Sequence, residues 1–224
     1  MHVDMHQDVW ALNNKEGDSN REWLDSRGIW AVNIMGSPGA GKTTVLEQLL
    51  PILHRDFRVG VIEGDVATSK DAQRISALGI PVIQLETQGV CHLDGRMVRS
   101  GLEALESLRL ELLFIENVGN LVCPADFFLG EHARLAVLST VEGGDKIVKY
   151  PTLFRRVSAL AVTKTDLLPF TDFDMESAAS DFAGFGAGRP VFAVSKSEGI
   201  AGVAAWVRTM SRNRARADMA DEQR

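Results

Sequence analysis

The sequence predicts an α/β fold with a doubly wound, mostly parallel sheet. Short apolar runs, of which residues 29–35 (IWAVNIM) are the clearest, have the composition of strands that are covered on both faces. Segments with an apolar stripe at helical spacing, such as residues 43–54, follow these runs. Strands that alternate with helices pair in parallel through right-handed crossovers, and such sheets bind ligands at the carboxyl ends of their strands.

The individual elements follow from these two patterns. Strands are expected at residues 29–35, 58–62, 81–85, 110–116, 135–139, 159–163 and 190–194. Helices are expected at residues 21–27, 43–54, 69–78 and 94–108. The glycine-rich segment FAGFGAG, residues 182–188, is expected to be a loop.

The chain is expected to form one domain between two less ordered ends. Residues 1–19 show little hydrophobic periodicity and are predicted to be a flexible leader. Residues 20–210 are predicted to form a single domain, because a chain of 224 residues has the length that one hydrophobic core supports. Residues 211–224 are predicted to be a polar C-terminal tail.

Composition excludes several classes of protein. The 30 acidic residues outnumber the 24 basic ones, and the net charge of -6 argues against a general nucleic-acid binder. Two cysteines cannot form a disulfide framework and favour a reducing compartment. The N-terminus lacks the apolar core of a secretory signal, and no stretch approaches the roughly 20 apolar residues that cross a bilayer. We therefore expect a cytoplasmic protein with no nucleic-acid or membrane partner.

The clearest motif is a phosphate-binding loop. Residues 36–43 (GSPGAGKT) satisfy the pattern G-x-x-x-x-G-K-[ST] between a predicted strand and a predicted helix, which indicates a P-loop NTPase architecture. Glycines let the backbone N–H groups turn toward a phosphate, and the helix N-terminus adds a positive dipole end. A chance glycine-rich turn is the alternative, but the flanking elements favour the phosphate site. The predicted phosphate-binding residues are Gly36, Ser37, Gly39, Ala40, Gly41, Lys42, Thr43 and Thr44.

A Mg²⁺ ion is expected beside this loop. Thr43 offers a hydroxyl ligand, and Asp65 and Glu116 follow two predicted strands, which places both carboxylates at the ligand edge of the sheet. Solvated or helix-capping carboxylates are the alternative interpretation. With Lys42, these two acids are the predicted catalytic residues. Gly119 is expected to let the backbone approach the γ phosphate, so that this loop responds to the nucleotide.

A second motif predicts guanine recognition. Residues 163–166 (TKTD) are close to the guanine-reading tetrad Asn-Lys-x-Asp. Asp166 supplies the carboxylate that accepts hydrogen bonds from the ring N–H and the exocyclic amine, and the stem of Lys164 covers the ring. Thr163 replaces the asparagine, and we expect this to weaken binding by about 0.5–1.5 kcal/mol, the contribution of one neutral hydrogen bond. Ser195 and Lys196 form either a further base-contacting loop or an ordinary surface loop.

Three sulfur and nitrogen ligands form a candidate transition-metal site. Cys91, His92 and Cys123 offer two thiols and an imidazole, which suit Ni²⁺ or Zn²⁺. Free cysteines more often act as small core residues, which is the alternative interpretation. Cys123 lies seven residues after Glu116, in the loop that is expected to respond to the γ phosphate. Three ligands leave the coordination incomplete, so a site shared across a two-fold axis is natural.

Taken together, these motifs resemble the hydrogenase maturation GTPase HypB family, nickel-incorporation factors that dimerise around nucleotide. The resemblance covers residues 20–202 through GSPGAGKTTVLEQL, VIEGDVAT, GVCHLDGRMV, LLFIENVGNLVCPADFFLGE, VEGGDKIVKYPTLF and KTDLLP. It implies a slow GTPase that uses GTP, GDP and Mg²⁺, forms a homodimer when GTP-bound, and works with a nickel-delivery accessory protein and the hydrogenase large subunit.

The resemblance also assigns roles to residues. It implies that Lys42 and Thr43 hold phosphates and Mg²⁺ and that Asp65 and Glu116 support the metal and the hydrolytic water. By the same likeness Lys164 and Asp166 read guanine. The metal site of the family's nucleotide-binding domain is matched by Cys91, His92 and Cys123.

The chain departs from the family at two points. Thr163 stands where the family usually has asparagine, which affects nucleotide affinity and the preference for GTP. The leader has neither a cysteine-rich nickel motif nor a long histidine-rich stretch, so tight capture of nickel is not expected. Three alternatives remain: the related urease nickel-insertion GTPase, an ATP-dependent small-molecule kinase that shares the phosphate loop, and a metal-binding protein without catalysis. The ENVGNLVCPA and VCHLDG segments favour the hydrogenase branch over the urease branch.

Overall fold

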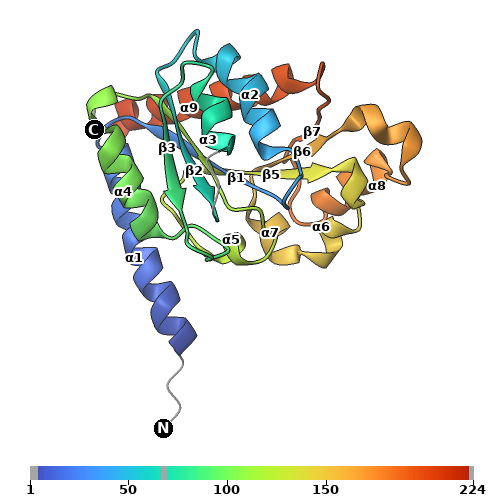
Figure 1. Ribbon diagram of the computed structural model, residues 1–224, viewed down its shortest axis with the longest axis horizontal. Coiled ribbons are helices and arrows are strands. Elements are labelled where there is room, and N and C mark those ends of the chain that lie inside the picture. Colours follow the sequence, from blue (N-terminus) through green and yellow to red (C-terminus); the bar gives the residue numbers. More distant parts are fainter. Residues whose placement is uncertain (1–4, 67–69, 222–224) are drawn as a thin grey trace.

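The computed structural model describes residues 5–66 and 70–221 and confirms the predicted α/β fold (Figure 1). Its sheet has seven strands in the order β3-β2-β4-β1-β5-β6-β7, and every neighbouring pair is parallel. All seven predicted strands are present among these residues. Their bounds are β1 (Trp30–Met35), β2 (Val59–Asp65), β3 (Val82–Glu86), β4 (Leu112–Glu116), β5 (Ala133–Ser139), β6 (Ala159–Thr163) and β7 (Val191–Ala193).

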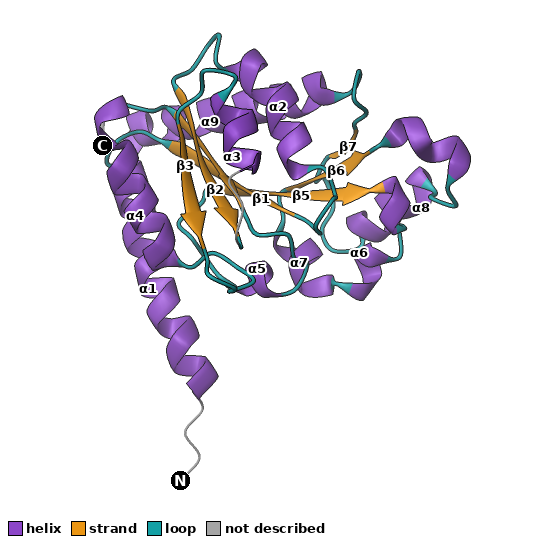
Figure 2. Ribbon diagram, in the orientation of Figure 1, coloured by secondary structure: helices purple, strands orange, loops and turns teal. Residues whose placement is uncertain are grey.

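Helices cover both faces of the sheet (Figure 2). One face packs against α2, α3 and α9, whereas α1 and α4 lie side by side on the other face and α6, α7 and α8 cover its β5–β6 half (Figure 1). The helices are α1 (Met5–Asp25), α2 (Lys42–Leu53), α3 (Lys70–Ser76), α4 (Gly95–Leu105), α5 (Cys123–Asp126), α6 (Lys146–Lys149), α7 (Pro151–Arg156), α8 (Met175–Ala183) and α9 (Ile200–Asp221).

The central strand β1 shows why its sequence is apolar apart from the buried Asn33. Side chains alternate between the two faces of a strand, and both faces of β1 are covered. Val32 and Ile34 join the core under α2 and α9, whereas Ala31 packs with α1 and α4 and Met35 with α7 and α8. The apolar run therefore ends only where the phosphate loop begins, at the carboxyl edge of the sheet.

The structure corrects the expectation for the N-terminal segment. Residues 1–19 were expected to be a flexible leader, with a helix only at 21–27, but α1 runs over Met5–Asp25. Residues 1–4 lie outside the described residues. Local sequence alone gave no reason for a helix here, because an isolated helix of this composition is marginal in water.

Two buried amides explain why this helix forms. Asn13 donates to Phe128 O at 2.9 Å and accepts from Gly95 N at 2.8 Å. Asn20 is fully buried and donates to Gly95 O at 2.7 Å and to Leu129 O at 3.1 Å. These bonds join α1 to the start of α4 and to the segment before β5, so tertiary contacts stabilise the helix.

The remaining differences concern short or terminal elements. The final helix α9 extends to residue 221, so most of the expected tail at 211–224 is helical, and residues 222–224 lie outside the described part. Residues 182 and 183 of the expected loop end α8, and the rest of that segment connects to β7. The expected helix at 69–78 is described from residue 70 onward. No helix in the described ranges is both long and apolar enough to cross a membrane.

Candidate functional site

The phosphate loop joins β1 to α2 in a conformation that requires its glycines. Gly39 and Gly41 have φ angles of +75° and +96°, in the left-handed region that favours glycine. The next residue, Lys42, begins α2 and places its Nζ 3.4 Å from Gly36 O and 3.3 Å from Ser37 O. Burial lowers the pKa of the Lys42 ammonium, and the neighbouring Glu116 opposes that shift. The loop thus holds one buried cation at the helix N-terminus.

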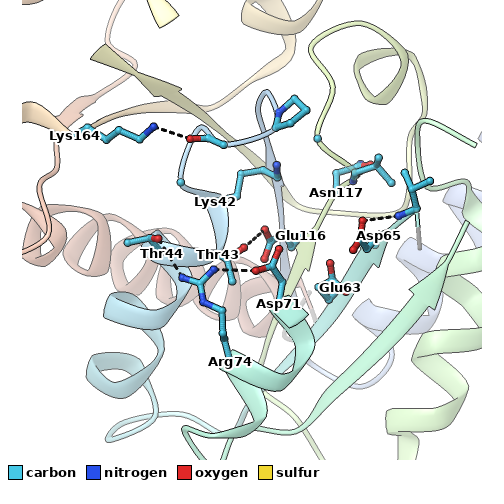
Figure 3. A pocket seen from close by; sticks show the side chains of 17 residues that line it. Lys42, Thr43, Thr44, Glu63, Asp65, Asp71, Arg74, Glu116, Asn117 and Lys164 are labelled. Carbon is cyan, nitrogen blue, oxygen red and sulfur yellow. Dashed lines mark hydrogen bonds and ion pairs between the residues drawn. The ribbon is translucent and has the colours of Figure 1, made fainter. Parts of the chain in front are cut away.

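A cavity of about 550 Å³ opens over this loop (Figure 3). The structure brings most of the predicted phosphate and magnesium residues together around it, whereas Gly36, Ser37 and the buried Ala40 do not line it. Its walls come from the phosphate loop, the end of β2, α3, the segment after β4 and the segment after β6. The lining residues are Pro38, Gly39, Gly41, Lys42, Thr43, Thr44, Glu63, Gly64, Asp65, Val66, Asp71, Arg74, Glu116, Asn117, Val118, Gly119 and Lys164.

Two buried carboxylates lie on the floor of this cavity. Thr43 donates its hydroxyl proton to Glu116 Oε1 at 2.7 Å, while Glu116 Oε2 is buried with no hydrogen-bond partner among the described residues. Glu63 is the register partner of Glu116 on β2, and its own Oε2 is also buried without such a partner. Burial raises the pKa of Glu63 to about 8, with the charge of Glu116 adding to the shift. Burial likewise raises the pKa of Glu116 to about 7, which the bond from Thr43 opposes.

These oxygens fit the predicted magnesium ion. Two orphaned carboxylate oxygens beside a hydroxyl provide the hard oxygen ligands that Mg²⁺ prefers, and a cation would remove the cost of burying both acids. Asp65 ends β2 at the same cavity and accepts a hydrogen bond from Val66 N at 2.6 Å. Thr43, Glu116, Glu63 and Asp65 are therefore the residues that would hold the ion.

Sequence reasoning missed three charged side chains of this cavity. Glu63 lies two residues before Asp65, and the alternation of a strand puts both on one face, which was a usable signal. On α3, Arg74 forms an ion pair with Asp71 at 2.9 Å and donates to Glu47 at 2.8 Å. Figure 3 shows Arg74 joined to Asp71 and also to Thr44, in the first turn of α2. No sequence pattern identified the pair, because α3 approaches the loop only through the fold.

The predicted base-binding residues line a second cavity of about 330 Å³. It shares Gly41, Thr44 and Lys164 with the phosphate cavity, so the two spaces adjoin across the phosphate loop. Lys164 Nζ donates to Gly39 O at 2.8 Å. The lining residues are Gly41, Thr44, Val45, Gln48, Thr163, Lys164, Asp166, Leu167, Val194, Ser195 and Lys196.

The thiols and the imidazole form a compact cluster. Cys91, His92 and Cys123 each offer a ligand atom, and these atoms all lie within 4.8 Å of one another. The His92 ring stacks on Phe127 with centroids 3.7 Å apart, which fixes its orientation. A hydrogen bond with Cys91, followed by burial, raises the pKa of the Cys123 thiol. Cys91 is exposed, so it is not the small core residue of the alternative interpretation.

The segment between Glu116 and Cys123 contacts both sites. Asn120 N donates to Gly36 O in the phosphate loop at 3.0 Å, and Asn120 Oδ1 accepts from Val122 N at 2.7 Å, directly before Cys123. Asn117 Oδ1 accepts from Leu93 N at 3.2 Å, directly after His92. Hydrogen bonds therefore lead from the phosphate loop to the residue before Cys123, and from the segment after Glu116 to the residue after His92.

Gly119 has a different neighbour from the one expected. The sequence suggested that it lets the backbone approach a γ phosphate, and it does line the phosphate cavity. Its closest contact, however, is Pro38: a Cβ at Gly119 would lie 2.9 Å from both Cα and N of that residue. The absence of a side chain is thus required for packing against the phosphate loop itself.

Comparisons with known proteins agree with this geometry. A family described as CobW/HypB/UreG, nucleotide-binding domain, matches residues 30–192. A hydrogenase maturation factor HypB from Azotobacter vinelandii is 41% identical over 223 residues, which covers 98% of this chain and 74% of the relative. Its counterpart from Azotobacter chroococcum mcd 1 is 46% identical over 175 residues and 78% of this chain, and the match spans 57% of that relative's length.

A solved structure supports the same assignment. The crystal structure of HypB from Helicobacter pylori in complex with nickel superimposes with a TM-score of 0.86 at 32% identity, covering 90% of this chain and 96% of that one. The family match spans most of the sheet and includes the phosphate loop, the cysteine cluster and the base cavity up to β7. The chain therefore belongs to the CobW/HypB/UreG family of nucleotide-binding domains.

Proposed function

We propose that this protein is a GTP-hydrolysing nickel metallochaperone that delivers Ni²⁺ during maturation of a nickel–iron hydrogenase. The names of the relatives and the nickel bound to the Helicobacter pylori neighbour support this proposal. The observation that carries it is the direct connection between the phosphate loop and the cysteine cluster through residues 116–123. A nucleotide-binding protein without cargo has no need of such a connection, and neither has a passive metal store.

Hydrolysis depends on positioning and charge. Lys42 and the inward N–H groups of the loop stabilise the charge that develops on the transferred phosphoryl group, and water is the nucleophile. Bound Mg²⁺ supplies further neutralisation of the phosphate oxygens. In this proposal Glu116 and Asp65 support the metal ion and the hydrolytic water. Asp166 and Lys164 select guanine. Turnover is slow in this proposal, because Arg74, the arginine of the phosphate cavity, is paired with Glu47 and Asp71.

Nucleotide state controls the metal site in this proposal. The γ phosphate changes the protein only through its different affinity for two conformations. One conformation favours a homodimer, in which ligands from two copies complete the coordination that three ligands leave open. An accessory nickel protein supplies the ion, and the large subunit of the hydrogenase receives it.

The experiment is a metal titration in two nucleotide states. Ni²⁺ and Zn²⁺ are titrated into the wild type, Cys91→Ala and Cys123→Ala, each with GDP and with a non-hydrolysable GTP analogue. We expect either substitution to abolish the site, and we expect the wild type to show different nickel affinities in the two states. His54→Ala, which removes an exposed imidazole remote from the cluster, is the control and retains the site. Unchanged stoichiometry in both cysteine variants contradicts the metal assignment, and equal nickel affinity in both states contradicts the switch.

A further inference from the structure

Thr163, the residue that departs from the guanine-reading tetrad, is bound to the phosphate loop. It ends β6 with an exposed fraction of 5%. Its Oγ1 lies 2.5 Å from Ala40 O and 3.4 Å from Leu138 O, and both of these atoms are backbone carbonyl oxygens. The contact with Ala40 O is much the shorter of the two, so this carbonyl receives the hydroxyl proton.

The chemistry of a hydroxyl limits what Thr163 can recognise. Threonine has one O–H donor, whereas asparagine has two N–H donors on its amide. The edge of guanine that carries N7 and O6 offers only acceptors. Once the proton of Thr163 is donated to Ala40 O, the side chain has only lone pairs left, and these cannot bind N7 or O6.

The next residue makes a second contact of the same kind. Lys164 Nζ donates to Gly39 O, and the Lys164 carbonyl accepts from the Thr140 hydroxyl at 2.8 Å. Lys164 has a φ angle of +57°, a left-handed conformation that a lysine adopts only where its surroundings impose it. Two consecutive side chains of the base loop thus bind two consecutive carbonyls of the phosphate loop.

We propose that Thr163 is a positioning residue that braces the phosphate loop at Ala40 and does not read the base. Base selection then rests on Asp166, the carboxylate of this cavity, which recognises donors on the opposite edge of guanine. The inference rests on the proposed binding of guanine nucleotides. An asparagine at this position could both hold the phosphate loop and contact N7 of the base. Thr163 performs only the first of these tasks.

Two substitutions of Thr163, combined with one change in the nucleotide, test the proposal. Affinities for GDP and for 7-deaza-GDP, in which N7 is replaced by a C–H group, are measured by isothermal titration with the wild type, Thr163→Val and Thr163→Ser. We expect the wild type to bind both nucleotides within about twofold. Thr163→Val should weaken both by the same factor, about three- to tenfold, because Ala40 O loses its donor. Thr163→Ser keeps the hydroxyl and should restore both affinities.

The contrary result is equally distinct. If Thr163 reads N7, the wild type binds 7-deaza-GDP more weakly than GDP and Thr163→Val removes that difference. Thermal unfolding shows whether Thr163→Val is folded. If it is not, the wild type alone tests the proposal: an affinity for 7-deaza-GDP more than about threefold below that for GDP overturns it. ADP is included to separate the two levels of inference. Equal affinity for ADP and GDP contradicts the proposed guanine specificity, whereas the comparison of each purine with its 7-deaza form still tests the brace.

Discussion

Glu63 and Glu116 are register partners on the adjacent parallel strands β2 and β4, with exposed fractions of only 2% and 3%. Each retains a buried oxygen, Oε2, without a hydrogen-bond partner among the described residues. Two neighbouring acids that both lose hydration destabilise the folded chain unless one is protonated or a cation lies between them. This pair therefore links folding to pH and to the ligand of the phosphate cavity.

In the absence of nucleotide and Mg²⁺, we expect the free energy of unfolding to fall as the pH rises between about 5 and 8. The folded pKa values of Glu63 and Glu116, about 8 and about 7, lie above the ordinary value of 4.5. In this window the folded state holds protons that the unfolded state has released, so rising pH favours unfolding. Glu63→Gln should make the slope shallower by up to about 1.4 kcal/mol per pH unit.

Urea unfolding across this pH range measures the slope. Glu103→Gln, which replaces an exposed carboxylate on α4, is the matched control and should follow the wild type. A slope in Glu63→Gln equal to that of the wild type would show that the buried pair does not govern the dependence.

Gly119→Ala should disturb the phosphate loop. The added Cβ would lie 2.9 Å from the backbone of Pro38, and backbone cannot yield as the end of a flexible side chain can. We expect a loss of about 1–3 kcal/mol in stability and weaker GDP binding, since overpacking shifts neighbouring backbone. Gly144→Ala is the control, because its Cβ would meet atoms no closer than 3.8 Å. GDP titration of both variants decides: equal affinities would mean that the loop tolerates the added atom.

The sheet was predictable because each strand carries its own signal. The residues of β1 and β4 are buried on both faces, and such strands appear as apolar runs without reference to any other part of the chain. The phosphate loop is predictable for the same reason, because its motif occupies eight consecutive residues. By contrast, the helical state of residues 5–19 depends on contacts with the start of α4 and with the segment before β5, which no local pattern encodes.

The site was predictable only where its residues follow strands. Asp65 was found because it follows an apolar strand segment. Glu63 lies inside that segment, and only its register with Glu116, some fifty positions away in the sequence, places it at the site. For Cys91 and Cys123 the residues alone favoured core packing over metal binding, and only the family resemblance favoured the metal site. Their proximity arises from the order β3-β2-β4, which brings the segments after β3 and β4 to the same edge of the sheet.

Asn20→Ala should destabilise the protein by loosening α1. The side chain is fully buried and donates to Gly95 O and Leu129 O, so its removal leaves two buried carbonyls without this donor. We expect a loss of about 1–3 kcal/mol in the free energy of unfolding, the cost of unsatisfied buried polar groups. Urea denaturation measures it, and Asn14→Ala, on the exposed side of the same helix, should stay within about 0.5 kcal/mol of the wild type. Equal effects of the two substitutions would contradict the anchoring role of Asn20.

Asn117→Ala should uncouple the nucleotide from the metal site. Asn117 follows Glu116 directly, and its Oδ1 accepts from Leu93 N, beside the ligand candidate His92. Without this bond the cysteine loop loses one of its ties to the segment that contacts the phosphate loop. Coupling energies between two ligand sites are typically about 1–3 kcal/mol. We expect the wild type to bind nickel with different affinities in the presence of GDP and of a GTP analogue. In Asn117→Ala the ratio of these two affinities should shrink toward unity by at least about threefold.

A matched control separates this coupling from general loosening. Asn33 is as buried as Asn117 and accepts a hydrogen bond from Asn117 Nδ2 at 3.3 Å, but among the described residues it makes no hydrogen bond to Leu93. Asn33→Ala therefore removes a buried amide from the same network and leaves the hydrogen bond from Leu93 N to Asn117 Oδ1 intact. Nickel titrations with GDP and with the GTP analogue should show a wild-type ratio for Asn33→Ala and a reduced ratio for Asn117→Ala. If both variants lose the ratio together, the coupling depends on the packing of the whole network and not on the contact between Asn117 and Leu93.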